Sequence, residues 1–169
     1  MLLDGFDRLE VFDKCYNKNE IEIISEDRRR EVTNVVYERL SVLDSFLLKQ
    51  FYDGDLVTSK YILTYAIAKT DSLFFEFLYE VYREALLGNK DYISIDDFEN
   101  FFAAKKEIDA IIAKWSECTI NDLSGGYRNI LVESGLGTRI KKNIHAEKVI
   151  IHPAVEEHIA LIGDVEFNK

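Results

Sequence analysis

The stretch that decides the fold is LVTSKYILTYAIAKTDSLFFEFLYEVYREALL, residues 56–87. It is apolar and aromatic on more than one helical face, so we expect helices here that other helices cover on several sides. Thr70-Asp71-Ser72 interrupts the run with residue types that cap helices, which predicts one helix before it and a second from Leu73 to Leu87. Gly88-Asn89 would end the second helix. This stretch is the predicted centre of the core.

Towards the N-terminus, a first helix is expected from Asp7 to about Cys15, and Ser25 is a candidate N-cap for the next one. Apolar residues spaced by three and four predict that this second helix continues to about Asp53. Gly54 would end it in a left-handed conformation. Between the two helices, Ile21–Ile24 is either a short strand or a linker.

Towards the C-terminus, two further cap patterns appear. Ser94 with Asp97 three residues later predicts a helix to about Trp115, and Thr119 opens a shorter predicted helix from Ile120 to about Glu133, closed by Ser134-Gly135.

A basic segment follows, and it leads into the β-branched run Val149-Ile150-Ile151, which is compatible with a small hairpin. Pro153 suits the first turn of a last helix through Ile162, with Gly163 at its end.

The single proline and the eight glycines, most of them at segment ends, favour an all-α fold. The 169 residues suit one domain, 1–169. Within it we expect a helix-turn-helix-like lobe (1–55), an apolar helical core (56–115) and a winged-helix-like lobe (116–169). The last expectation rests on the order helix, short capped helix, basic loop, which is typical of a winged helix-turn-helix.

The composition excludes several classes of protein. Hydrophobic residues make up 47% and charged ones 31%, the mix of a folded soluble protein. Twenty-one Lys and Arg against 31 Asp and Glu give a net charge of −10, which argues against a protein that coats nucleic acid without specificity. The longest uncharged run in the middle of the chain, Tyr61–Ala68, is far too short to span a bilayer, and the N-terminus does not resemble a secretory signal. We expect a cytoplasmic protein without membrane contact.

The sequence holds no catalytic or metal motif. GxGxxG, the P-loop, HExxH and GxSxG are absent, and the two cysteines form no CxxC pair. The three histidines, His145, His152 and His158, lack the i, i+4 spacing of helical metal ligands. No enzyme activity, cofactor, metal or small-molecule substrate is therefore expected.

Basic residues gather in two places. Arg28, Arg29 and Arg30 form one run, and between Arg128 and Lys148 five basic residues meet two acids, a local balance of +3 in an acidic chain. This is how a local phosphate-binding surface would look, although surface lysines paired with neighbouring acids give the same pattern. The candidate nucleic-acid-binding residues are Arg28, Arg29, Arg30, Arg128, Arg139, Lys141, Lys142 and Lys148.

Acidic residues gather between Asp71 and Glu99, where eight acids meet only Arg83 and Lys90. Glu76, Glu80 and Glu84 follow at i, i+4 spacing on one predicted helix face. The face is either simply solvated or a docking surface for a basic partner protein.

Two segments resemble a known family: KTDSLFFEFLYEVYRE (69–84), and AKWS (113–116) with Phe101-Phe102 before it. They are similar to the BrxA family of bacteriophage-exclusion (BREX) defence systems. The resemblance implies an all-helical cytoplasmic protein with two helix-turn-helix elements, which binds double-stranded DNA among other BREX proteins and is not itself an enzyme. The family pattern of two such elements places Arg28–Arg30 in the first element and the helix around Arg128 in the second.

The chain departs from the family pattern in one place. Relatives usually carry lysines in the helix after the tryptophan, whereas this chain has Asp122, Ser124, Gly125 and Gly126. Each interior glycine costs a helix about 1 kcal/mol, and fewer positive charges mean fewer phosphate contacts. An adaptor that docks through Glu76, Glu80 and Glu84, with little DNA contact, is the alternative function.

Overall fold

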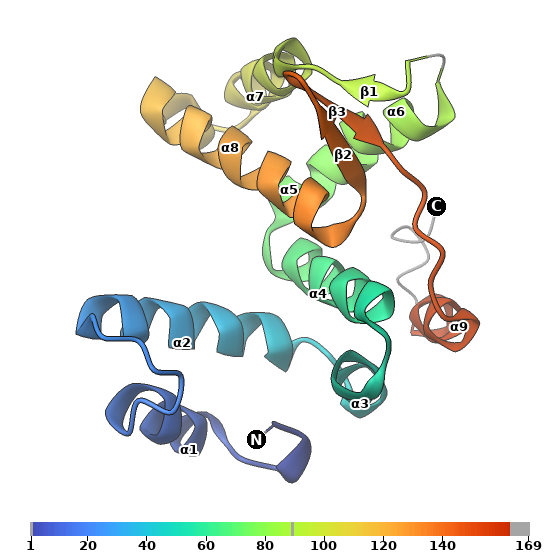
Figure 1. The fold of residues 1–169 in the computed structure, drawn as a ribbon. Coiled ribbons are helices and arrows are strands. Elements are labelled where there is room, and N and C mark those ends of the chain that lie inside the picture. The colour runs from blue at the N-terminus through green and yellow to red at the C-terminus, as the bar shows by residue number, and fades with distance from the viewer. Residues whose placement is uncertain (1, 89, 163–169) are drawn as a thin grey trace. The chain divides into compact units, whose positions relative to one another are not determined.

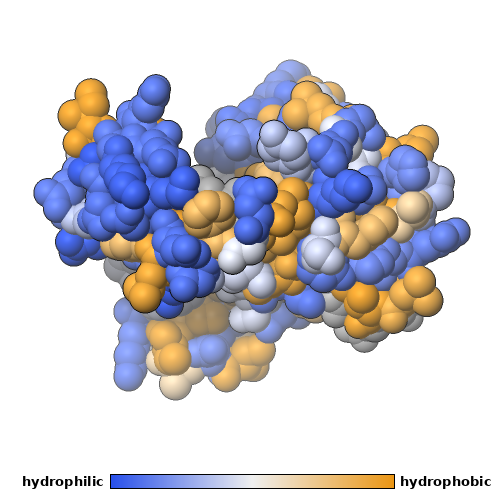
Figure 2. All heavy atoms as spheres, turned by 90° about the horizontal axis from the view of Figure 1, so that it is seen from below, coloured by the Kyte–Doolittle hydropathy of each residue, from blue (hydrophilic) through white to orange (hydrophobic). Residues whose placement is uncertain are grey.

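The computed structural model describes residues 2–88 and 90–162, and the chain divides between Thr70 and Asp71 into two units (Figure 1). Helices dominate both units, which confirms the mostly helical class. The described residues contain no helix long and apolar enough to cross a membrane. On the face drawn in Figure 2, hydrophilic residues predominate and apolar ones occur in separate groups.

The regular elements of the first unit are all helical within its described residues. It contains a 3-10 turn η1 (Leu2–Asp4), α1 (Arg8–Phe12), a π-helical turn η2 (Asp13–Asn17), α2 (Glu26–Ser41), α3 (Ser45–Asp53) and α4 (Leu56–Thr70). Helix α4 packs against α2 and α3, and its residues Ile62, Tyr65 and Ala66 are almost completely buried. Ser25 caps α2 as expected, and Ile21–Ile24 form a linker without strand structure.

Two expectations for this unit are wrong. The helix predicted to continue from Ser25 to Asp53 is two helices, because Asp44 caps α3 by accepting a 2.9 Å hydrogen bond from the Leu47 N–H. Gly54 does not adopt a left-handed conformation, since its φ is −73°. A Cβ there would lie 2.3 Å from the Gln50 carbonyl oxygen, so close approach of the backbone explains the glycine.

The second unit combines helices with a small sheet. It contains α5 (Ser72–Phe77), a π-helical turn η3 (Leu78–Tyr82), α6 (Arg83–Leu87), β1 (Tyr92–Ile93), α7 (Ile95–Ile108), a 3-10 turn η4 (Ile112–Lys114), α8 (Glu117–Ser134), β2 (Gly137–Ile140), β3 (Asn143–Ala146) and α9 (Pro153–Leu161). The antiparallel sheet has the order β1-β3-β2.

Aromatic side chains fill the core of this unit. Phe74, Phe77, Phe98 and Phe102 are at most 2% exposed, and the Phe77 and Phe98 rings stack with centroids 4.7 Å apart. From α8, the Tyr127 ring packs against Phe74 and Phe77.

Most predicted caps of the second unit are confirmed. Asp71 caps α5, the Ser94–Asp97 capping box begins α7, and Gly135 ends α8 with a φ of 82°. Pro153 lies in the first turn of α9, while the expected stop at Gly163 lies outside the described residues.

Three boundaries of the second unit differ from prediction. Helix α7 ends at Ile108 rather than Trp115, because the Asp109 carboxylate accepts the N–H groups of Ile111 and Ile112. Helix α8 begins at Glu117 because Ser116, not Thr119, is its N-cap.

The third difference concerns the hairpin. The hairpin exists, but its strands are residues 137–140 and 143–146, and the β-branched run 149–151 is not a strand.

Candidate nucleic-acid interface

The hairpin β2–β3 presents the densest group of basic residues in the second unit. Ile140 pairs with Asn143, so the turn consists of Lys141 and Lys142 alone, and both are exposed. Lys141 has a φ of 57°, a left-handed conformation that non-glycine residues rarely adopt. The turn therefore holds two ammonium groups at the tip of a short two-stranded arm.

Two arginines tie this arm to α8. Arg128 on α8 donates from Nη2 to the Lys142 carbonyl oxygen at 2.8 Å, and Arg139 on β2 donates from Nη2 to Asn129 Oδ1 on α8 at 3.0 Å. One bond runs from the helix to the turn and the other from the strand to the helix. Because a guanidinium has five N–H donors, each arginine keeps donors for a further acceptor.

Lys148 lies two residues beyond β3 and is exposed. Its neighbour Glu147 accepts a hydrogen bond from the Thr138 hydroxyl on β2, and the Glu147 backbone carbonyl accepts one from the Tyr82 hydroxyl at 2.6 Å. The chain that leaves the hairpin is thus fixed to the rest of the unit, with an acid beside Lys148.

Helix α8 contributes little positive charge to this surface. Its exposed residues include Asp122 and Glu133 among neutral ones such as Asn121, Gly126 and Asn129. A Cβ added at Gly125 or Gly126 would meet nothing within 4 Å, so no contact within the described structure requires either glycine. We therefore assign the positive surface to the hairpin rather than to α8.

Arg28–Arg30, the other basic run, belongs to the first unit and is engaged within it. Arg28 pairs with Glu31 at 2.8 Å, and Arg29 donates to the Ile23 carbonyl oxygen at 3.2 Å. Arg30 donates to the Tyr16 hydroxyl at 2.9 Å.

Arg29 and Arg30 also lie over the Tyr16 ring, 5.5 and 5.2 Å from its centroid. These two side chains hold η2 against the start of α2, a structural role that the run of charges did not reveal.

Two of the three acids in the predicted row Glu76, Glu80 and Glu84 are paired with a lysine. Lys105 of α7, only 5% exposed, places its Nζ 2.7 Å from Glu76 Oε2 and 2.6 Å from Glu80 Oε1. Burial opposes the ammonium form, yet these two hydrogen bonds outweigh it and raise the pKa of Lys105. Glu84, which follows η3 on α6, forms no ion pair with Lys105.

Lys105 was missed by sequence reasoning, although a signal existed. Phe98, Phe101, Phe102 and Lys105 follow the i, i+3, i+4, i+7 pattern of a buried helix face. A lysine at the last of these positions indicates a buried cation, which must be paired.

Among the described residues, no group of three or more His, Cys, Asp or Glu could hold a metal ion. His152 is used as the N-cap of α9, where Nδ1 accepts the Ala154 N–H at 3.2 Å.

Comparison with known proteins identifies the family. The family model described as BrxA matches residues 1–163. The BREX protein BrxA of Bacillus cereus (strain H3081.97) is 35% identical over 164 residues, which cover 97% of this chain and 82% of that protein. A crystal structure of an uncharacterized protein from Magnetospirillum magneticum shows the same fold, with a TM-score of 0.85 at 20% sequence identity. The superposed residues cover 98% of this chain and 84% of that protein's chain. The chain therefore belongs to the BrxA family of BREX phage-defence proteins.

Proposed function

We propose that this chain is a nonenzymatic, cytoplasmic DNA-binding subunit of a BREX system, and that the hairpin β2–β3 makes its main contact with the phosphate backbone. The observation that carries the proposal is the exposed Lys141–Lys142 turn, held to α8 by Arg128 and Arg139. Lysine ammonium groups on a fixed arm suit phosphate oxygens, which position a protein on a duplex without reading its sequence.

The order of elements supports the same proposal. Helix α7, the short turn η4, helix α8 and the hairpin follow one another as in a winged helix-turn-helix, with the hairpin as the wing. In this chain the charge lies on the wing, because α8 exposes acids and neutral residues. We therefore expect weak dependence on DNA sequence and a dominant electrostatic contribution.

The experiment is a binding titration of labelled duplexes with the full chain and with Lys141→Ala/Lys142→Ala. The double variant should bind weakly, and the loss should be about equal for duplexes of unrelated sequence, because phosphate contacts carry no sequence information. Lys49→Ala/Lys60→Ala is the matched control, since it removes two exposed lysines from α3 and α4. If the control lost as much affinity as the hairpin variant, the hairpin would not be the contact.

Arg28, Arg29 and Arg30 are secondary candidates within this proposal. Arg28 is accessible, since its side chain is 63% exposed and its partner Glu31 is also exposed. An exposed ion pair of this kind contributes little stability and is readily exchanged for a phosphate. Arg28→Ala should therefore weaken DNA binding more than it weakens the fold.

The adaptor role is the second candidate, and one observation favours it. Glu80 and Glu84 line a groove in the second unit. Because Glu76 and Glu80 hold the buried Lys105, reversing their charge would disturb the fold, so Glu84 alone is suited to a test. Loss of a partner protein from a pull-down with Glu84→Lys, at unchanged DNA affinity, is the result that this candidate predicts.

A further inference from the structure

A groove of about 400 Å³ lies in the second unit between η3 and α6 on one side, and β1 and α7 on the other. Its volume falls within the range of about 300–1,000 Å³ that is usual for ligand sites. Val81, Ala85, Ile93 and Phe101 provide apolar surface, while Glu80, Glu84 and Asp97 provide carboxylates. The groove thus combines an apolar lining with negative charge.

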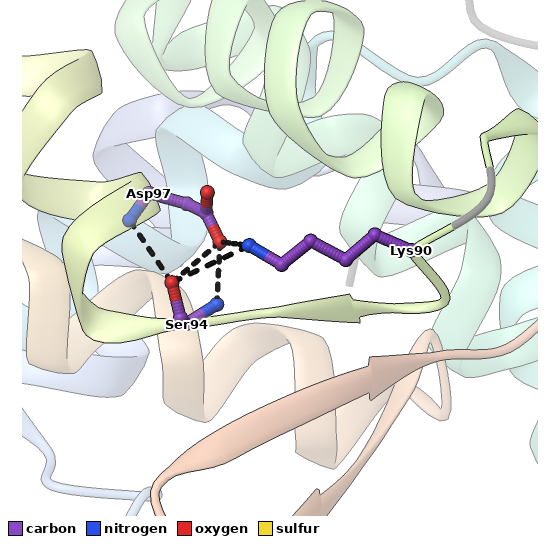
Figure 3. Close-up of polar contacts among 3 residues, drawn as sticks. All are labelled: Lys90, Ser94 and Asp97. Atoms are coloured by element: carbon purple, nitrogen blue, oxygen red, sulfur yellow. Dashed lines mark hydrogen bonds and ion pairs between the residues drawn. The ribbon is translucent and has the colours of Figure 1, made fainter.

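Lys90 shows which chemistry the groove accepts. Its ammonium group bonds to Asp97 Oδ2 and approaches Ser94 Oγ at 3.5 Å (Figure 3). The same group lies 4.7 Å from the centroid of the Tyr92 ring. A cation between a carboxylate and an aromatic face is a favourable arrangement for lysine and arginine side chains. Lys90 is still 44% exposed in its side chain, so it fills the position incompletely.

The carboxylate that holds Lys90 is fixed and charged. Asp97 Oδ2 also accepts the Ser94 N–H at 2.6 Å and the Ser94 hydroxyl at 2.7 Å. Burial opposes its ionisation, but the hydrogen bonds from Lys90 and Ser94 hold the pKa of Asp97 below its usual range. Glu84, by contrast, is exposed at the groove and makes no ion pair or side-chain hydrogen bond with another described residue.

The groove also follows the edge of the sheet. Among residues 2–88 and 90–162 the strand order is β1-β3-β2, so β1 pairs with one neighbouring strand, and its residues Tyr92 and Ile93 line the groove. Figure 3 shows the Lys90 side chain alongside β1, on the side away from the hairpin. An open strand edge is a site where extended peptides add by backbone pairing while pockets receive alternate side chains.

We propose that this groove binds an extended, basic segment of another protein, whose lysine or arginine side chain takes the position of Lys90 between Tyr92 and Asp97, while Glu84 adds negative charge to the same groove. An adjacent apolar side chain of the segment would lie against Val81 and Phe101. The charge of the groove is complementary to such a segment, because its lining contains the carboxylates of Glu80, Glu84 and Asp97 and a single ammonium group, that of Lys90. The inference does not rest on DNA binding, which uses the hairpin, and it gives the adaptor role a defined site.

The test begins with an array of overlapping 15-residue peptides that covers the other BREX proteins encoded in the same genome, probed with the full chain. The peptides that bind should contain lysine or arginine next to apolar residues. Each is then resynthesised with a fluorescent label and titrated with the wild-type chain and three variants. Denaturant unfolding of each variant verifies that it is folded.

The three variants have different expected effects. Glu84→Lys should weaken peptide binding about tenfold or more, because it places a like charge in the groove. Glu107→Lys, the same change at an exposed position of α7 outside the groove, should alter affinity less than about twofold. Lys90→Ala should strengthen binding about three- to tenfold, because it removes the competing ammonium group.

Three results would overturn the inference: no peptide binds, Glu84→Lys and Glu107→Lys weaken binding equally, or Lys90→Ala weakens it. DNA titrations separate this outcome from the proposed function. Lys141→Ala/Lys142→Ala should keep its peptide affinity and lose DNA affinity, whereas Glu84→Lys should lose only peptide affinity. Failure of one surface therefore leaves the other measurable.

Discussion

Arg128 Nη2 donates a 2.8 Å hydrogen bond to the backbone carbonyl oxygen of Lys142, which connects the middle of α8 to the turn of the hairpin. The bond orients the turn that carries Lys141 and Lys142. Arg128 is therefore better described as a residue that positions the Lys141–Lys142 turn, which we propose to bind phosphate, than as one of several equivalent surface charges.

Arg128→Lys tests this role because it keeps the charge but removes the planar donor group. We expect it to weaken DNA binding nearly as much as Arg128→Met, and both variants to accelerate amide hydrogen exchange in residues 139–146. Loss of the bond should cost about 1 kcal/mol of stability. If Arg128→Lys bound DNA like the wild type and left exchange unchanged, Arg128 would act through its charge alone.

Lys141→Gly should separate stability from binding. The φ of 57° at Lys141 is costly for a residue with a side chain, and glycine relieves this cost while it adds freedom to the unfolded chain. The net expectation is a gain of about 0.5 kcal/mol in urea unfolding together with weaker DNA binding. Lys142 does not have a positive φ, so a glycine there relieves no strain. Lys142→Gly is therefore the matched control and should lower stability. Equal destabilisation by both glycines would contradict the assigned turn geometry.

Lys105→Met should destabilise the second unit by about 2 kcal/mol, because two charge-assisted hydrogen bonds are lost and Glu76 and Glu80 then repel each other. The neighbouring variant Lys106→Met is the control. Lys106 pairs with the exposed Glu117, so this substitution should lower the free energy of unfolding by less than about 1 kcal/mol.

The contribution of Lys105 should depend on pH. Its pKa in the folded state is raised above the ordinary 10.5. The stability that it provides is therefore fully present below pH 10.5 and is lost as the pH rises through the folded-state pKa. The difference in unfolding free energy between wild type and Lys105→Met should shrink over that range, and a difference that stayed constant would contradict the assigned pairing.

Gly125→Ala and Gly126→Ala should each stabilise α8 by about 1 kcal/mol, because an added Cβ meets nothing within 4 Å at either position. DNA affinity should stay within about twofold if, as we propose, the hairpin rather than this face of α8 makes the contact. A large loss of DNA binding in either alanine variant would show that α8 approaches the DNA closely at the glycines.

Local signals in the sequence predicted much of the fold. Ser25, Asp71 and Ser94 bond to backbone N–H groups three residues away, so their capping role depends only on neighbouring residues. Asp44 and Asp109 cap in the same way, but apolar spacing continues past them and suggested uninterrupted helices. Strand β1 could not be predicted, since it consists of two residues that pair with β3 about 50 positions later.

The candidate sites were less predictable because they depend on pairings between distant segments. The sequence placed Arg128 and Arg139 in a basic cluster, but their bonds to Lys142 and Asn129 appear only when the hairpin lies against α8. Likewise, the predicted acidic row contains the two partners of Lys105, which comes from a different helix. Residue types predicted the charges, and only the fold decides which of them remain available.

The most direct test of the account is the salt dependence of DNA affinity, measured by fluorescence anisotropy with one labelled duplex. For the full chain, log K should fall steeply and linearly with log salt concentration, and for Lys141→Ala/Lys142→Ala the slope should be shallower by about 1.8, as expected for two lost phosphate contacts. No binding at low salt, or the same slope for both proteins, would contradict a phosphate-binding hairpin.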